Sequence, residues 1–146
     1  MEEEIKKAKE KAMSLLLIKD RTEKELSERL YHSGFSEVAC EEAMEYVKSF
    51  GYIDDFRYAK NFIDFRKNEK SKKEIQFKLL QKGVCLELIA VAMEEEYDGE
   101  TEALQRALKK RLKGKSISDL TLREKQKLIA SLARKGFSLS EILKQV

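Results

Sequence analysis

Proline is absent from this sequence of 146 residues, and only six glycines interrupt it. Because proline breaks helices and glycine weakens them, their scarcity favours helix along almost the whole chain. No run of about 18 apolar residues occurs, so we expect no transmembrane helix. The opening stretch, MEEEIKKAKEKA, is charged and lacks the apolar centre of a secretory signal. We therefore expect a cytoplasmic protein.

Cysteine and histidine are also scarce, so few side chains are suited to metal binding or nucleophilic catalysis. Cys40 and Cys85 stand in apolar stretches with no metal-ligand spacing around them, which predicts reduced thiols in the core. The single histidine, His32, has no serine or cysteine constellation that the sequence reveals. No P-loop, HExxH or paired-cysteine motif occurs. We expect no enzymatic activity, no metal and no cofactor.

Charged side chains are abundant, and their two signs are unevenly distributed. They make up 39% of the sequence, and the formal net charge is +3. Residues 1–50 carry nine basic and twelve acidic side chains, and residues 51–98 carry nine and ten. Residues 99–146 carry twelve basic and only five acidic side chains, a net charge of +7. Such an excess is typical either of a surface that meets a polyanion or of solvated helix faces.

Three glycines mark an internal repeat, because Gly34, Gly83 and Gly136 lie 49 and 53 residues apart. Apolar residues stand eight and four positions before each glycine: Leu26 and Leu30, Ile75 and Leu79, and Leu128 and Leu132. A spacing of four places both members of each pair on one helix face. A glycine after such a pair suits the left-handed position that ends a helix.

The flanking residues predict three helices in each repeat. Thr22 with Glu25, and Ser71 with Glu74, have the spacing of a capping box. Further helices are expected to begin at Ser36, at Asp54 or Asp55, at Asp119 or Thr121, and at Ser138. The pattern therefore predicts an all-α fold of three tandem three-helix repeats, at residues 1–50, 51–98 and 99–146. Because no such unit has a large core of its own, we expect stacking into an elongated, curved array, right-handed or solenoid-like.

Four stretches of the sequence resemble the RecX family, and their order and spacing match across essentially the whole chain. The matching residues are Arg21, Thr22, Glu25, Leu26 and Gly34, then Gly51, Asp54, Asp55, Arg57, Tyr58 and Ala59, then Ile75, Leu79 and Gly83, and last Leu132, Arg134 and Gly136. The run GYIDD-x-RYA is the most specific piece, because glycine helix stops occur in many helical repeats. The chain departs at Asn68-Glu69-Lys70, where family members often have a glycine before the fifth helix.

The resemblance implies a non-enzymatic regulator in DNA repair that binds RecA recombinase filaments on single-stranded DNA. Proteins of this family lie along the filament groove and restrain ATP hydrolysis, filament growth and strand exchange. The resemblance also implies a cofactor-free monomer whose partner is the RecA-type recombinase. The resemblance leaves open whether the protein also binds DNA directly and weakly.

Two clusters of basic residues are the candidate contact surfaces. The first comprises Arg66, Lys67, Lys70, Lys72, Lys73 and Lys78, with Lys60 and Lys82 beside them. The second comprises Arg106, Lys109, Lys110, Lys113, Lys115, Arg123, Lys127, Arg134 and Lys135, with Arg111 and Lys125 beside them. Lys109, Lys110 and Lys113 are predicted to share one helix face. Such side chains contact phosphates without reading base sequence, or meet acidic surface on the recombinase.

Five aromatic residues of the middle repeat invite a base-stacking interpretation: Tyr52, Phe56, Tyr58, Phe62 and Phe65. Their helical spacing beside Ala59 and Ile63 instead predicts that most of them belong to the core. Tyr58 is the one that we expect at the surface.

Two other classes of protein remain open. The segment TEKELSERLYHSGFSEVACEEAMEYV resembles a helix-turn-helix of a transcription regulator. However, its recognition helix would carry four acidic side chains that phosphates repel: Glu37, Glu41, Glu42 and Glu45. The other class is a protein-binding helical scaffold, which would leave the net charge of +7 at residues 99–146 unexplained.

Overall fold

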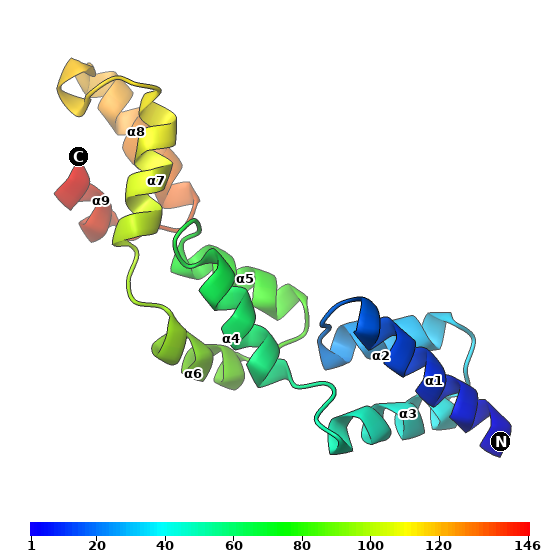
Figure 1. Ribbon diagram of the computed structural model, residues 1–146. Coiled ribbons are helices and arrows are strands. Elements are labelled where there is room, and N and C mark those ends of the chain that lie inside the picture. The colour runs from blue at the N-terminus through cyan, green and yellow to red at the C-terminus, as the bar shows by residue number, and fades with distance from the viewer. The chain divides into compact units, whose positions relative to one another are not determined.

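A computed structural model describes all 146 residues and contains nine α-helices, one short 3₁₀ turn and no β-strand. The helices are α1 (Glu2–Ile18), α2 (Glu23–His32), α3 (Glu37–Ser49), α4 (Asp55–Arg66), α5 (Lys72–Gln81), α6 (Leu86–Glu96), α7 (Thr101–Leu112), α8 (Leu122–Arg134) and α9 (Leu139–Gln145), and the 3₁₀ turn is η1 (Ile117–Asp119). Figure 1 shows this order along the chain. The predicted all-α repeat fold is confirmed. None of these helices has both the length and the apolar character that crossing a bilayer requires.

The chain forms two compact units. The first contains residues 1–59 and 79–89, and the second contains residues 60–78 and 90–146. Three helices fall in each of the ranges 1–50, 51–98 and 99–146, as the repeat pattern predicts. The division into three repeat domains at those boundaries stays a prediction.

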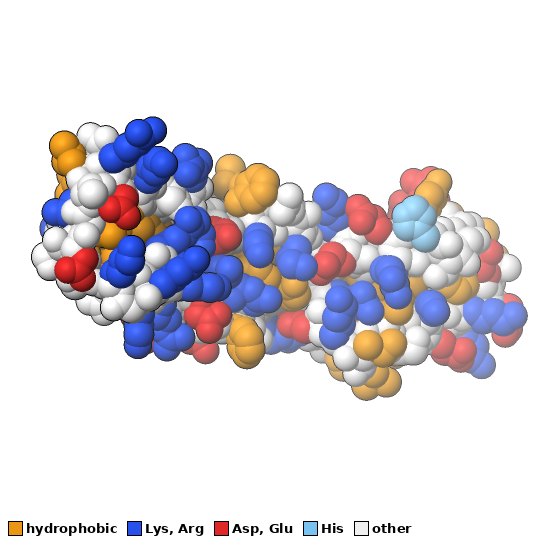
Figure 2. Space-filling model, turned by 90° about the horizontal axis from the view of Figure 1, so that it is seen from above, with side chains coloured by type: hydrophobic (Ala, Val, Ile, Leu, Met, Phe, Trp, Pro, Cys, Tyr) orange, Lys and Arg blue, Asp and Glu red, His pale blue; other side chains and the backbone are white.

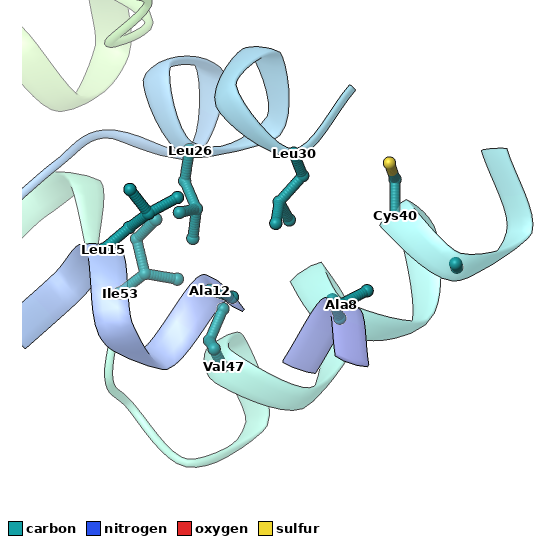
Figure 3. Close-up of a cluster of buried hydrophobic side chains, with 10 residues drawn as sticks. Ala8, Ala12, Leu15, Leu26, Leu30, Cys40, Val47 and Ile53 are labelled. Carbon is teal, nitrogen blue, oxygen red and sulfur yellow. The ribbon is translucent and has the colours of Figure 1, made fainter. Parts of the chain in front are cut away.

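In the first unit, helices α1, α2 and α3 close around one apolar core (Figure 3). Ala8, Ala12 and Leu15 recur at spacings of four and three along α1, so they form one buried face. Leu26 and Leu30 of α2 are fully buried and point into the same core. The two alanines are small, which lets α1 and α3 approach closely.

In the second unit, helices α7, α8 and α9 share a core built in the same way. Its buried members are Ala103, Leu104 and Leu108 of α7, Leu128 and Leu132 of α8, Phe137, and Ile142 of α9. Phe137 follows the helix-ending glycine Gly136, and its amide donates to the carbonyl oxygen of Leu132 at 3.3 Å. Phe137 is buried and therefore packs back against the helix that has just ended.

The three repeat glycines have the backbone conformation that the sequence predicts. Gly34, Gly83 and Gly136 have φ angles of 91°, 94° and 99°, a region that side chains with a Cβ rarely occupy. Each therefore lets its helix stop and the chain turn without strain.

The predicted helix starts are also confirmed, and the open alternatives are resolved. Thr22 with Glu25 forms a complete capping box, and Ser71 accepts a hydrogen bond from the Glu74 amide at 3.2 Å. Asp54 caps α4, because its carboxylate accepts from the amides of residues 56 and 57 at 3.0 and 3.1 Å. Thr121, rather than Asp119, begins α8.

Two predictions about the core are wrong in part. Cys40 is buried, but Cys85 is exposed because it immediately precedes the first turn of α6 and lies outside the helix's apolar face. Of the five aromatics, only Phe62 is buried. Tyr52 and Phe65 are exposed, and Phe56 and Tyr58 are half-buried. The buried face of α4 runs through residues 59, 62 and 63, which leaves Phe65 to one side of it.

Candidate anion-binding surface

In the second unit, a serine hydroxyl attaches the loop after α8 to the start of α5. Ser71 Oγ donates to the carbonyl oxygen of Lys135 at 2.6 Å while accepting from the Glu74 amide. A Cβ at Gly136 would lie 2.7 Å from Ser71 Oγ, so only glycine permits this approach. Ser71 is fully buried. The contact brings Lys135 and Lys70, which are 65 positions apart in the sequence, to the same surface.

A second hydrogen bond fixes the backbone of Lys70. The Tyr97 hydroxyl donates to the Lys70 carbonyl oxygen at 3.1 Å. Burial of the phenol, together with the negative charge of Glu100, raises the pKa of Tyr97 to about 12. The hydroxyl therefore keeps its proton at neutral pH and remains a donor to Lys70.

Four cationic side chains converge on a cavity of about 290 Å³ in this unit. They are Lys70 from the loop before α5, Arg106 and Lys110 from α7, and Lys135 from the loop after α8. Ala107 and Glu69 complete the lining. We call this cavity the four-cation pocket.

The charges of the four-cation pocket are only partly neutralised. Arg106 pairs with Glu102 at 3.3 Å and with Glu69 at 3.6 Å. Lys70, Lys110 and Lys135 form no ion pair with a carboxylate. Positive charges held near one another repel unless an anion lies between them. The pocket is therefore suited to bind an anionic group such as a phosphate.

Most of the other predicted basic residues are exposed around this pocket or along α5 and α8. Exposed side chains of the two clusters include Lys72, Lys73, Lys78, Lys109, Lys115, Arg123, Lys127 and Arg134. Figure 2 shows Lys and Arg side chains gathered over the α7–α9 part of the second unit. Their positions on helix surfaces suit contacts to a phosphate backbone, which need no base recognition.

Two predicted contact residues have other roles in the structure, and a third lies off its expected helix face. Lys67 bridges Asp64 and Asp98, each at 3.3 Å, so its charge is compensated. The Arg66 guanidinium stacks over the Phe62 ring, 3.7 Å from the ring centre. Lys113 lies beyond the last residue of α7 in a left-handed conformation. The prediction that Lys113 shares a helix face with Lys109 and Lys110 is therefore wrong.

Sequence reasoning missed the residues that assemble the pocket. Ser71 was identified as a helix cap, but nothing in the sequence names the Lys135 carbonyl as the partner of its hydroxyl. No sequence pattern marks Tyr97 or Glu69 as part of a site. A lone tyrosine beside an acidic helix end is common on protein surfaces. The repetition of Lys-Gly at residues 82–83 and 135–136 was the one available clue.

The residues that carry the resemblance to the RecX family occupy structural positions in the fold. Arg21 is buried, and its Nε donates to the Leu15 carbonyl oxygen at 3.3 Å. The Asp55 carboxylate accepts from the Glu23 amide at 2.9 Å, at the N-terminus of α2. Ala59, Ile75 and Leu79 are fully buried. These positions therefore stabilise helix ends and cores.

The fold defines an all-α helical-repeat protein, and its basic surface is a candidate anion-binding face. Family models for the first and third three-helix domains of RecX match residues 8–46 and 98–145, respectively. The chain belongs to the RecX family of regulatory proteins.

Individual relatives agree with this assignment. The chain is 35% identical to "Regulatory protein RecX" of Caldanaerobacter subterraneus subsp. tengcongensis over 97% of its length and 70% of the relative's. It is 33% identical to the protein of that name from Chlorobium phaeobacteroides over 97% of this chain and 94% of the relative. The crystal structure of RecX from Lactobacillus salivarius superposes with a TM-score of 0.80 at 22% identity, covering 99% of this chain and 95% of that one. At that identity the superposition supports the fold alone.

Proposed function

We propose that this protein binds RecA recombinase filaments on single-stranded DNA and restrains their ATP hydrolysis, growth and strand exchange. It does so by occupancy and not by catalysis. Its cationic second unit contacts the phosphate-rich nucleoprotein surface, and its bound presence opposes filament extension. Membership of a family of regulatory proteins supports this proposal, as does the resemblance of its sequence motifs to those of recombinase regulators.

The four-cation pocket is the observation that carries the proposal. It gathers cations from three segments of the chain, and hydrogen bonds from Ser71 and Tyr97 hold two of those segments in place. Preorganised cations bind phosphates more strongly than flexible ones, because less side-chain and backbone freedom is lost on binding. A polyanion with closely spaced phosphates is the ligand that best matches several cations at one surface.

A helix-turn-helix regulator is less well supported. The helix that would read bases, α3, carries four acidic side chains, and an open cavity beside it is lined by four carboxylates against two lysines, Lys24 and Lys48. Phosphates on either side of a DNA groove would repel that surface. The proposed function therefore uses the second unit for nucleic-acid contact.

The decisive experiment is the rate of ATP hydrolysis by RecA on single-stranded DNA, measured with increasing amounts of this protein. The test variant combines Lys70→Glu, Lys110→Glu and Lys135→Glu. The matched control combines Lys6→Glu, Lys7→Glu and Lys11→Glu, which makes the same charge change on exposed positions of α1. Thermal unfolding of both variants checks that the fold is intact.

We expect the wild type and the α1 control to inhibit hydrolysis, and the pocket variant to need at least about tenfold more protein for the same inhibition. If the pocket variant inhibits hydrolysis as strongly as the wild type, the four-cation pocket does not contribute to inhibition. No inhibition by the wild type would reject the proposed function.

A further inference from the structure

A second cavity in the second unit combines an apolar floor with a cationic rim. It has a volume of about 310 Å³ and lies where α7 ends and α8 begins. Leu112, Leu120 and Leu128 form its floor. The 3₁₀ turn η1 directly precedes Leu120. We call this cavity the leucine-floored pocket.

Four basic side chains surround the leucines, opposed by a single carboxylate. The basic residues are Arg111, Lys113, Lys115 and Lys127, and the carboxylate is Glu124. Glu124 is already engaged at the N-terminus of α8, where its Oε1 accepts from the Thr121 amide at 3.1 Å. That hydrogen bond is the main reason that the pKa of Glu124 lies below its usual value. The rim therefore keeps a positive excess that no residue of this pocket neutralises.

Lys113 caps the C-terminus of α7, where its backbone N–H donates to the Lys109 carbonyl oxygen at 3.3 Å. Its φ of 50° and ψ of 45° are left-handed, a conformation that suits glycine and strains a lysine. Gly114, which also has a positive φ, follows directly. The helix dipole favours cations at the end of α7, but it gives no reason for Lys115 beyond the helix or Lys127 within α8.

The two pockets of this unit suit different ligands. Ala107 is the only apolar residue that lines the four-cation pocket, whereas three leucines line this one. Nucleobases are usually held by aromatic side chains, and the leucine-floored pocket has none. An aliphatic floor favours an aliphatic side chain, and a cationic rim favours carboxylates around it.

We propose that the leucine-floored pocket binds a short acidic peptide segment of a partner protein, with one leucine-like side chain inserted between α7 and α8. The four-cation pocket then serves phosphates, and this one serves protein. The proposal does not depend on which protein carries the segment, so it is tested separately from the inhibition of RecA.

The test uses the full chain and a fluorescein-labelled synthetic dodecapeptide that is rich in glutamate and contains two leucines four positions apart. A second peptide replaces both leucines with alanine and keeps the charge. Binding is followed by fluorescence anisotropy, and an unlabelled oligothymidylate is the competitor. The rim variant combines Lys113→Glu with Lys127→Glu, and Lys125→Glu, on α8 outside the pocket lining, is the control.

We expect the leucine peptide to bind the wild type at least about tenfold more tightly than the alanine peptide, because only the former buries apolar surface. The rim variant should lose at least about tenfold in affinity for the leucine peptide, while Lys125→Glu should change it less than about threefold. Lys113→Gly should bind more weakly although it relieves backbone strain and unfolds at an equal or higher denaturant concentration.

Three results would overturn the proposal. The first is equal affinity for the two peptides, which would mean attraction between charges alone. The second is a rim variant that loses oligothymidylate affinity and keeps peptide affinity, which would make this a nucleic-acid site. The third is the absence of peptide binding to the folded wild type.

Discussion

The Thr22 hydroxyl donates a hydrogen bond at 2.5 Å to the carbonyl oxygen of Lys82, which lies 60 residues further along the chain. Thr22 Oγ1 also accepts from the Glu25 amide at 3.2 Å, so one hydroxyl both caps α2 and holds the loop after α5. Glu25 reinforces the contact through an ion pair with Lys82 at 3.5 Å. Ser71 and Lys135 repeat the arrangement in the second unit. A single recurring contact therefore links one helix start to the following Lys-Gly helix end.

Loss of this hydroxyl should destabilise the fold more than loss of an ordinary cap. Thr22→Val leaves a part-buried amide and a part-buried carbonyl without their partner, and we expect a loss of about 2 kcal/mol in the free energy of unfolding. Thr121 caps α8 at an exposed position, so Thr121→Val should lose only about 1 kcal/mol. Urea unfolding of both variants measures the difference, and equal losses would show that the contact with Lys82 contributes nothing.

The three repeat glycines should respond unequally to alanine. All three have positive φ, which costs an alanine about 1 kcal/mol. At Gly34 nothing lies within 4 Å of an added Cβ, whereas at Gly83 it would overlap Lys24 Cβ and at Gly136 it would meet Ser71 Oγ. We expect Gly34→Ala to lose about 1 kcal/mol and the other two to lose at least about twice as much. Similar melting temperatures for the three variants would contradict this account.

The repeat, the helix faces and most helix ends could be predicted from the sequence, because each depends on residues close together in the chain. Leu26 and Leu30 lie one turn apart, and Thr22 lies three residues before Glu25. The four-cation pocket could not be predicted in the same way. Its members come from three segments, and the hydrogen bonds that align those segments end on backbone carbonyls, which every residue has. Helical spacing also could not distinguish buried Phe62 from exposed Phe65.

The buried carboxylate of Asp55 should make stability depend on pH. Burial is the main reason that its pKa lies above the usual value of 3.8, although the Glu23 amide opposes the shift. The folded chain therefore holds this proton more tightly than the unfolded chain, and ionisation of Asp55 destabilises the fold as pH rises just above that value. Asp55→Asn keeps an oxygen for the Glu23 amide and removes this dependence.

We therefore expect Asp55→Asn to be at least as stable as the wild type at neutral pH. Its stability should also fall less than that of the wild type between pH 3.8 and neutral pH. Asp55→Ala, which removes the acceptor as well, should lose about 1 kcal/mol or more. Urea titrations across this range are the measurement. An asparagine variant as unstable as the alanine variant would show that the charge itself is needed.

Tyr97 should support the four-cation pocket without contacting its ligand. Tyr97→Phe removes the hydrogen bond to the Lys70 carbonyl, and we expect a loss of about 1 kcal/mol in stability together with weaker binding of the filament. The titration step with a pKa of about 12 should disappear from the tyrosinate absorbance of this variant. Unchanged filament binding by a folded Tyr97→Phe chain would show that the position of Lys70 is set elsewhere.

The salt dependence of binding to RecA filaments on single-stranded DNA tests the central claim most directly. Each phosphate neutralised on single-stranded DNA contributes roughly 0.7 to the slope of log affinity against log salt concentration. We predict steeply salt-dependent binding by the wild type, and a slope shallower by about 2 when Lys70, Lys110 and Lys135 are all changed to Gln. The account would be contradicted if the wild type did not bind filaments, or if the triple variant bound them with the wild-type slope.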